Sequence, residues 1–154
     1  MSGMASGNFT IRRAASADLQ NLLALYRHIN STDRELAPEL AQDRFSAILA
    51  QPGMTVFIGF IDEIAASTVT LIVIPNLTRN GASYALIENV VTHAGHRKQG
   101  YAGKIIRHAI AQAWEAGCYK VMLLTGSKDP ATLRFYENCG FLQDKTGYQI
   151  RRQS

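Results

Sequence analysis

Alternating apolar and polar residues along the chain predict a series of β-strands. Two runs rich in β-branched residues, Met54–Ile61 and Ile64–Ile74, are separated only by Asp62-Glu63, which predicts an antiparallel hairpin. Similar runs bounded by turn residues predict further strands at 9–12, Tyr84–Thr92, 119–125, 141–143 and 147–152.

Apolar residues at helical spacing predict four helices between these strands. The first begins after Ser16, a residue type that caps helices, and spaces its apolar residues along one face from Leu19 to Ile29. The other three are expected at 38–49, at 101–116 with a stop at Gly117, and at Pro130–Asn138 behind the cap Asp129 with a stop at Gly140.

The element order β-α-α-β-β-β-α-β-α-β-β describes a mixed α/β (α+β) fold with helices flanking a sheet. A chain of 154 residues that is 47% hydrophobic can bury the core of one globular domain. We therefore expect a single domain over residues 8–154. The preceding residues 1–7, MSGMASG, are expected to form a flexible tail.

Neither a membrane segment nor a disulfide is expected. No apolar run approaches the roughly 18 residues that a membrane helix needs, and the first residues lack the basic and apolar regions of a secretory signal. Cys118 and Cys139 both lie beside apolar residues, which favours two buried thiols in a reducing compartment. These features predict a cytoplasmic protein.

The positive charge of the chain is concentrated at one loop. The formal net charge is +4, and Arg97, Lys98, Lys104 and Arg107 lie close together in the sequence. A nucleic-acid-binding protein would show a basic stripe with interleaved stacking aromatics. We therefore expect a small polyanionic ligand at this loop, and neither a nucleic acid nor a membrane as partner.

The segment from Leu86 to Ile106 reads LIENVVTHAGHRKQGYAGKII, a strand followed by a polar loop and the start of a helix. The first backbone N–H groups of a helix lack intrahelical partners and, with the helix dipole, bind anions. Gly100 and Gly103 remove side chains where an anion would approach the backbone. This arrangement predicts a site for a ligand that carries a pyrophosphate.

Four interpretations of this site compete. A dinucleotide-binding turn needs G-x-G-x-x-G and an acidic residue on the following strand, and the chain has only Gly100-Tyr-Ala-Gly103. A Walker loop needs G-x-x-x-x-G-K-[ST], which is absent. A helix start softened by glycine, with solvated Arg and Lys, would bind nothing. The fourth is a coenzyme A loop, because Arg97-Lys-Gln-Gly-Tyr-Ala102 forms an R-x-x-G-x-A run.

That run resembles the coenzyme A loop of the GNAT superfamily of N-acetyltransferases. A second segment, Leu133–Phe141 with the sequence LRFYENCGF, resembles the later signature of the same superfamily, a helix that carries a Tyr and ends at Gly-Phe. On these two signatures the chain is identified as a member of the superfamily. The C-terminal half is also similar to the glucosamine-6-phosphate N-acetyltransferases, at Ile87–Val91, Gly117–Lys120, the second signature and Tyr148–Arg151.

The resemblance implies a GNAT fold, with acetyl-CoA as cosubstrate and no metal. In that fold the sheet splays between the strand ending near Val91 and the strand starting at Tyr119, and the pantetheine arm satisfies the unpaired backbone there. The resemblance also implies a homodimer. The residues expected to bind the cosubstrate are Val90, Val91, Thr92, Arg97, Lys98, Gln99, Gly100, Tyr101, Ala102, Gly103, Lys104, Asp129 and Tyr136.

Two residues are candidates for proton transfer. By resemblance, Tyr136 points at the coenzyme sulfur, and a phenol stays protonated at neutral pH and can donate to a leaving thiolate. Glu88 is a carboxylate in an apolar strand, and strand alternation places it on the face of Leu86 and Val90, opposite Val91. It could deprotonate or bind the amine, or form an ordinary ion pair with an Arg.

The acceptor carries no readable motif. The leading hypothesis is the primary amine of a small molecule, with an amino sugar as one candidate; the alternatives are a protein or peptide amine and a non-catalytic acyl-CoA sensor. Contacts are expected from the first two helices, residues 31–35 and residues 75–83. His93 and His96 form an H-x-x-H pair without further ligands, so no metal site is expected.

Overall fold

The computed structural model describes residues 7–153, which divide into two compact units, one up to Leu123 and one from Leu124 onward. The predicted tail, residues 1–7, lies outside the described residues except for Gly7. The boundaries of a single domain stay a prediction. No helix among the described residues is long and apolar enough to cross a membrane.

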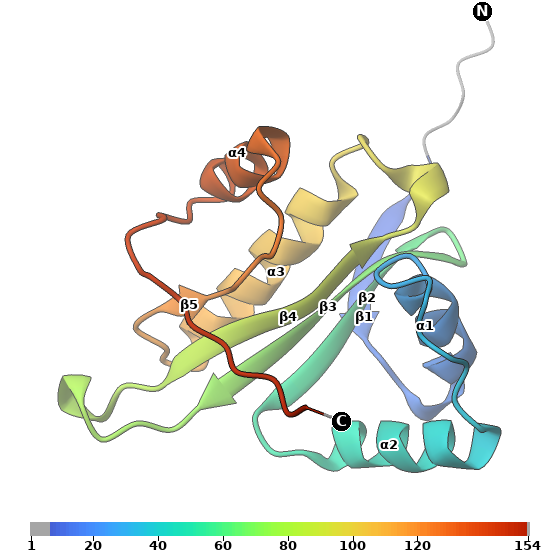
Figure 1. Cartoon of the computed structure of the whole chain (residues 1–154), viewed down its shortest axis with the longest axis horizontal. Helices are drawn as coiled ribbons and strands as arrows, with labels where there is room; N and C mark the ends of the chain where they lie inside the picture. Colours follow the sequence, from blue (N-terminus) through green and yellow to red (C-terminus); the bar gives the residue numbers. More distant parts are fainter. Residues whose placement is uncertain (1–6, 154) are drawn as a thin grey trace, which may run out of the picture. The chain divides into compact units, whose positions relative to one another are not determined.

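The first unit is built on a five-stranded sheet with the strand order β1-β2-β3-β4-β5 (Figure 1). Neighbouring strands from β1 to β4 are antiparallel, while β4 and β5 are parallel because the connection between them crosses over through a helix. The predicted mixed, mostly antiparallel sheet is therefore confirmed. The strands are β1 (Phe9–Arg13), β2 (Met54–Ile61), β3 (Ile64–Ile74), β4 (Tyr84–Thr92) and β5 (Val121–Met122).

Helices cover both faces of this sheet (Figure 1). On one face, Leu22 of α1 (Leu19–Tyr26) and Phe45 of α2 (Pro38–Ala50) pack with inward residues of β2 into one buried cluster. On the other face lies α3 (Tyr101–Glu115), which buries Ile105 and Ile106 completely. Burying a side chain of this size stabilises a fold by roughly 1.5–3 kcal/mol, so these apolar stripes hold the layers together.

The start of α1 differs from the prediction. Ser16 opens a short 3-10 turn, Ser16–Asp18, and its side chain caps no helix. Asp18 instead lies at the helix start, where its carboxylate accepts from the backbone N–H of Ala15 and binds both terminal nitrogens of Arg12, at 2.7 and 2.9 Å. Asp18 is buried because this ion pair ties β1 to the start of α1, a contact between two elements that helical spacing does not reveal. The helix also ends at Tyr26, one turn before Ile29.

The sheet confirms some predicted strands and shortens another. The hairpin of β2 and β3 and the strand β4 have the predicted bounds, because their β-branched residues pair on both sides in the sheet. In contrast, the strand predicted at 119–125 is formed only at Val121–Met122. β5 lies at the edge of the sheet and pairs with β4 alone, so its length is set by that single neighbour.

The second unit contains the predicted fourth helix, α4 (Pro130–Asn138). The carboxylate of Asp129 accepts from the N–H of Ala131 at 3.0 Å, which confirms the predicted cap, and Gly140 follows the helix with a φ of 101°. The strands predicted at 141–143 and 147–152 are not formed. Within this unit the described residues include no strand to pair with them, and Leu142, Tyr148 and Ile150 are exposed.

Candidate functional site

The loop between β4 and α3 has the backbone conformation of an anion site. A 3-10 turn, Ala94–His96, follows β4, and Gly100 then precedes the first residue of α3 with a φ of 84°. The space around Gly100 is open, since no heavy atom lies within 4 Å of the position that a Cβ would occupy. The free N–H groups of the first turn of α3 therefore face a gap that glycine leaves clear.

Four cations, Arg97, Lys98, Lys104 and Arg107, lie in the loop and in the first turns of α3. The three ion pairs found among residues 7–153 involve none of Arg97, Lys98, Lys104 and Arg107. Arg97 donates from Nε to the carbonyl of Thr92 at 3.3 Å, and the Arg107 guanidinium lies 2.9 Å from the position of a Cβ at Gly103. Their uncompensated charge at a helix N-terminus suits a polyanion.

An aromatic pair supports the first turn of α3. The rings of Phe9 and Tyr101 stack at 4.6 Å, and the Lys104 ammonium lies over both rings at 5.7 and 5.8 Å. Tyr101 is buried, so its side chain packs while its backbone belongs to the anion-binding turn. Phe9 was not singled out from the sequence, because a residue of the first strand shows no sign of the helix it will meet.

The sheet opens beside the second half of β4. Pairing of β4 with β5 ends at Leu86 and Met122, whereas β4 continues to Thr92. The main chain from Ile87 onward therefore has no neighbouring strand on this side among the described residues. Val90 and Val91, two of the residues expected to bind the cosubstrate, lie in this open part. The predicted splay is thus present in the first unit.

A β-bulge interrupts β4 at the candidate base. Thr70 of β3 lies opposite Glu88, but Thr68 lies opposite Val91, so two steps on β3 match three steps on β4. Asn89 takes up the extra residue with a φ of 51°. The alternation predicted from the sequence holds for Leu86 and Glu88 but is wrong for Val91, because the bulge turns Val91 onto the face of Glu88.

Glu88 itself is exposed and takes part in none of the ion pairs among residues 7–153. The alternative of an ordinary ion pair with an Arg therefore has no support in this structure. Its face of the sheet is the one covered by α1, since Tyr26 hydrogen-bonds with Thr70 and Thr68. The sequence placed Tyr26 on the apolar face of a helix and gave no sign that its hydroxyl would lie on the same face of the sheet as Glu88.

The other face of β4 carries an unusual pair of hydroxyls. Ser67 and Thr92 lie opposite each other in the ladder, and both hydroxyl oxygens are buried without a hydrogen-bond partner among the described residues. The carbonyl of Thr92 binds Arg97, so this residue joins the open part of β4 to the cationic loop.

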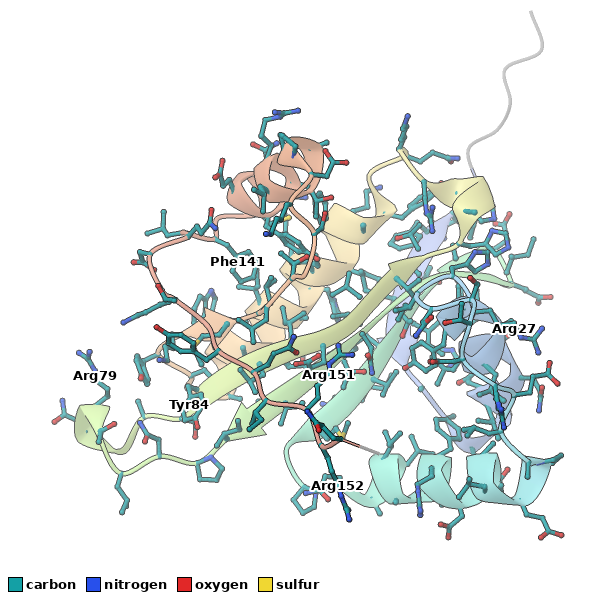
Figure 2. All side chains as sticks on the ribbon, viewed as in Figure 1. Arg27, Arg79, Tyr84, Phe141, Arg151 and Arg152 are labelled. Atoms are coloured by element: carbon teal, nitrogen blue, oxygen red, sulfur yellow. The ribbon has the colours of Figure 1, made fainter. Side chains whose placement is uncertain are left out.

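In the second unit, Tyr136 lies on α4 among aromatic side chains. Its ring contacts Phe135 at 5.1 Å and Phe141 edge-on at 6.2 Å. Burial and the neighbouring Cys139 raise the pKa of the Tyr136 hydroxyl, which keeps the phenol protonated at neutral pH. Figure 2 labels Phe141 in this unit.

Comparison with known proteins assigns the chain that carries these features to a family. Residues 22–141 match the model of the acetyltransferase (GNAT) family. The chain is a member of the GNAT acetyltransferase family. That match includes the cationic loop, the bulge of β4 and α4.

Three relatives illustrate how far the likeness reaches. The structure of a "Putative acetyltransferase from Agrobacterium tumefaciens str. C58" is 50% identical, with a TM-score of 0.90, and covers 93% of this chain and 99% of that one. A "Probable glucosamine 6-phosphate N-acetyltransferase 2" of Oryza sativa subsp. japonica is 35% identical over 65 residues, 42% of this chain and 37% of the relative. The "Glucosamine 6-phosphate N-acetyltransferase" of Trypanosoma brucei brucei is 35% identical over 72 residues, 47% of each. The match thus spans less than half the length of these two curated relatives.

The GNAT family uses acetyl-CoA, and the cationic loop of this chain fits such a ligand. The ligand is a polyanion with a pyrophosphate. The loop offers four cations that have no carboxylate partner among residues 7–153, and a helix N-terminus left clear by Gly100. Lys98 also has a positive φ, of 62°, so both it and Gly100 shape the loop by left-handed backbone. Gln99, Lys98 and Arg97 are exposed around it, whereas Gly103 is buried against Arg107.

Imidazole rings gather at the end of β4. His28 lies 4.5 Å from His93, and His93 lies 5.5 Å from His96. The His93 Nδ1 accepts from the backbone N–H of Gly95 at 2.9 Å. Partial burial and the charges of His93 and Arg97 lower the pKa of His28. These contacts bring the residues that follow α1 against the start of the cationic loop of this GNAT protein.

Proposed function

We propose that this protein is an acetyl-CoA-dependent N-acetyltransferase that acetylates the primary amine of a small molecule. The observation that carries the proposal is the cationic loop at the N-terminus of α3, in a chain of the GNAT family. Arg97, Lys98, Lys104 and Arg107 are charged and have no carboxylate partner among residues 7–153, and such an arrangement suits the pyrophosphate and phosphate groups of coenzyme A.

Backbone and side chains would share the binding of the cosubstrate. The N–H groups of Tyr101, Ala102 and Gly103 belong to the first turn of α3 and would donate to the pyrophosphate. The open edge of β4 at Val90, Val91 and Thr92 would offer main-chain groups to the pantetheine amides and to the acetyl carbonyl. Gln99 and Asp129 complete the residues proposed for this role, with Asp129 also capping α4.

The chemistry needs a base and an acid. Bound acetyl-CoA supplies an acetyl group as a thioester. Glu88 would take the proton that the amine nitrogen loses as the new C–N bond forms, and Tyr136 would give its phenolic proton to the sulfur as the C–S bond breaks. The raised pKa of Tyr136 supports this role, because the phenol is protonated before transfer.

We propose an amino sugar phosphate as the acceptor. Both curated relatives reported above carry the name glucosamine 6-phosphate N-acetyltransferase, over a matched region that covers less than half of each. Residues 31–35, which follow α1, are exposed, and residues 75–83 form the connection that precedes β4. Both segments belong to the first unit, which also contains Glu88. We propose that these two segments contact the acceptor.

A thiol-release assay with acetyl-CoA tests the proposal. We expect release of coenzyme A with glucosamine 6-phosphate and slower release with glucosamine, lysine, polyamines and a peptide with a free N-terminus. Faster release with the peptide would replace the small-molecule acceptor with a protein amine. Thermal stabilisation by acetyl-CoA without release for any amine would favour an acyl-CoA sensor, since a ligand that binds only the folded state raises the melting temperature by mass action.

The proposal extends to a cytoplasmic homodimer. In the second unit, Leu142, Tyr148 and Ile150 are 80%, 90% and 99% exposed, and such apolar side chains favour burial against another surface. Light scattering coupled to size-exclusion chromatography should give twice the chain mass of 16.9 kDa. A monomer mass at micromolar concentration would contradict the dimer and leave the catalytic proposal unaffected.

A further inference from the structure

The last residue of α1 connects the helix to the central strands. The ring of Tyr26 packs against the buried cluster that contains Leu22 and Phe45, while its hydroxyl hydrogen-bonds with the side chains of Thr70 and Thr68 on β3. Thr68 also donates from Oγ1 to the carbonyl of Phe57 at 2.8 Å. A buried hydroxyl is costly unless it is paired, so these groups fix the position of the end of α1 on the sheet.

The two threonines flank the β-bulge from the side of β3. Thr70 lies opposite Glu88 and Thr68 opposite Val91, with the bulged Asn89 and Val90 between them. Side chains directly opposite each other in an antiparallel ladder have Cβ atoms about 4.5–5.5 Å apart. The Tyr26 hydroxyl is therefore separated from the proposed base by one threonine.

The residues after Tyr26 lead into the segment proposed to contact the acceptor. Arg27 pairs with Glu35 at 3.2 Å, and the Asn30 side chain accepts from Thr32 and donates to Asp33. These contacts join residues of the 27–35 segment to one another. Figure 2 shows Arg27 beside α1. The position of this segment relative to Glu88 consequently depends on how the end of α1 is attached to β3 and β4.

Packing alone does not explain this combination of residues. A phenylalanine at position 26 would fill the same space in the cluster, and valines would suit the centre of the sheet at positions 68 and 70. Instead both threonines are buried, Thr68 with 0% exposure and Thr70 with 1%, and each presents its hydroxyl to the hydroxyl of Tyr26 on α1. Complementary polar groups on the two elements specify one arrangement of the helix on the sheet.

We propose that Tyr26 is a positioning residue for the acceptor. Through Thr70 and Thr68 its hydroxyl holds the start of residues 27–35 in register with the β-bulge, and so sets the distance between the acceptor amine and Glu88. This inference rests on the proposed function for the identity of the acceptor segment and of the base. The placement of Tyr26 itself rests on its hydrogen bonds.

The test compares Tyr26→Phe with a matched tyrosine on the same strand as Glu88. Tyr84→Phe removes a hydroxyl at the start of β4, at the opposite end of that strand from Thr92 (Figure 2). Thr70→Val removes one of the two threonine partners of the Tyr26 hydroxyl, and Thr70→Ser retains it. Hydrogen exchange of the backbone amides is measured for all four variants and for the unmodified chain, without any substrate.

We expect Tyr26→Phe and Thr70→Val to accelerate exchange by roughly 2- to 10-fold within 27–35 and at 88–92, as the loss of one buried hydrogen bond allows. Tyr84→Phe and Thr70→Ser should leave both segments at the rate of the unmodified chain. Unchanged exchange in Tyr26→Phe, or an acceleration spread evenly over the sheet, would overturn the proposal and reduce Tyr26 to a packing residue.

A kinetic experiment with glucosamine 6-phosphate measures the functional consequence. Tyr26→Phe should lower kcat/KM for the amine by about 10-fold while the Kd of acetyl-CoA stays the same, and Thr70→Ser should retain activity that Thr70→Val loses. Equal losses in amine turnover and acetyl-CoA binding would overturn the positioning role. If the unmodified chain does not turn over this sugar, the proposed acceptor fails, and the exchange measurements still decide the role of Tyr26.

Discussion

The cationic loop begins at Arg97, only six positions after Val91 in the β-bulge of β4, yet the two regions are built in different ways. The loop, from Arg97 to Lys104, uses backbone N–H groups, left-handed residues and local charges, all from one stretch of chain. The bulge at Glu88 is defined by its pairing with Thr70 and Thr68 of β3, and these two threonines hydrogen-bond with Tyr26 of α1. Binding by the loop should therefore depend on local changes, whereas proton transfer at the bulge should depend on distant contacts.

The largest expected effect lies outside both regions. Tyr136→Phe should lower kcat by roughly 10²–10⁴-fold, the usual contribution of a general acid, because the leaving thiolate loses its proton donor. The Kd of acetyl-CoA, measured by calorimetry, should stay the same. Full activity in this variant would mean that water protonates the thiolate. Phe135→Leu, which alters the neighbouring ring contact, serves as the control for packing.

Glu88→Gln tests the bulge directly. If Glu88 removes the amine proton, the variant should lose kcat/KM by up to about 10²–10⁴-fold below the pKa of the acceptor amine, and the deficit should shrink at higher pH where the free amine is abundant. A pH–rate profile measures this. A loss confined to KM would show that Glu88 binds a charged amine, and normal kinetics with a lower melting temperature would indicate a structural role. Glu63→Gln, in the hairpin turn, is the control.

Gly100→Asp tests the loop. The side chain fits, because the space around Gly100 is open and Asp tolerates left-handed backbone, but its carboxylate would repel a pyrophosphate. We expect thermal stabilisation by acetyl-CoA to disappear. Two controls separate charge from shape: Gly100→Asn places a neutral side chain of the same form there, and Gly117→Asp repeats the change after α3 at another open left-handed glycine. An unchanged stabilisation in Gly100→Asp would refute the loop assignment.

Asp18→Asn tests the attachment of α1. The hydrogen bonds from Arg12 lower the pKa of Asp18 from 3.8 to about 2, so the ionised carboxylate stabilises the fold. This stabilisation is present above pH 3.8 and is lost as the pH falls through about 2, since both folded and unfolded chains are then protonated. The variant should lower the free energy of unfolding by about 1–3 kcal/mol at neutral pH, measured by urea denaturation.

If the cationic loop and the β-bulge are independent, Asp18→Asn should leave acetyl-CoA binding intact and reduce amine turnover, because α1 carries Tyr26. An equal loss of both would show that the loop also depends on the position of α1. Arg44→Gln removes an exposed ion pair with Asp43 on α2 and should change the unfolding free energy by less than about 1 kcal/mol.

The smallest effect concerns the ring contact between His28, which follows α1, and His93, which follows β4. Partial burial, His93 and Arg97 lower the pKa of His28, so the neutral imidazole is favoured in the fold. Protonating His28 is therefore costly in the fold: the cost is absent well above the ordinary pKa of 6.5 and reduces the stability of the fold as the pH falls below it. An NMR titration should place the His28 pKa below 6.5, and His93→Gln should raise it. A His28 pKa that His93→Gln leaves unchanged would mean that His93 has no part in the shift.

The sequence by itself determined the elements whose signals are local. The hairpin of β2 and β3 and the helix α4 behind Asp129 lie where the pattern predicted them, because alternation, capping and turn residues act within a few positions. The cationic loop was predicted for the same reason: its charges and glycines are adjacent in the chain.

Only the tertiary structure decided the features that depend on neighbours distant in sequence. The bulge at Asn89 reverses the face of Val91, and the hydroxyl of Tyr26 reaches two threonines on β3. The strands predicted at 141–143 and 147–152 did not form, since a strand exists only where another backbone accepts its hydrogen bonds. A local pattern specifies which residues can share a face, and the pairing partner specifies whether they do.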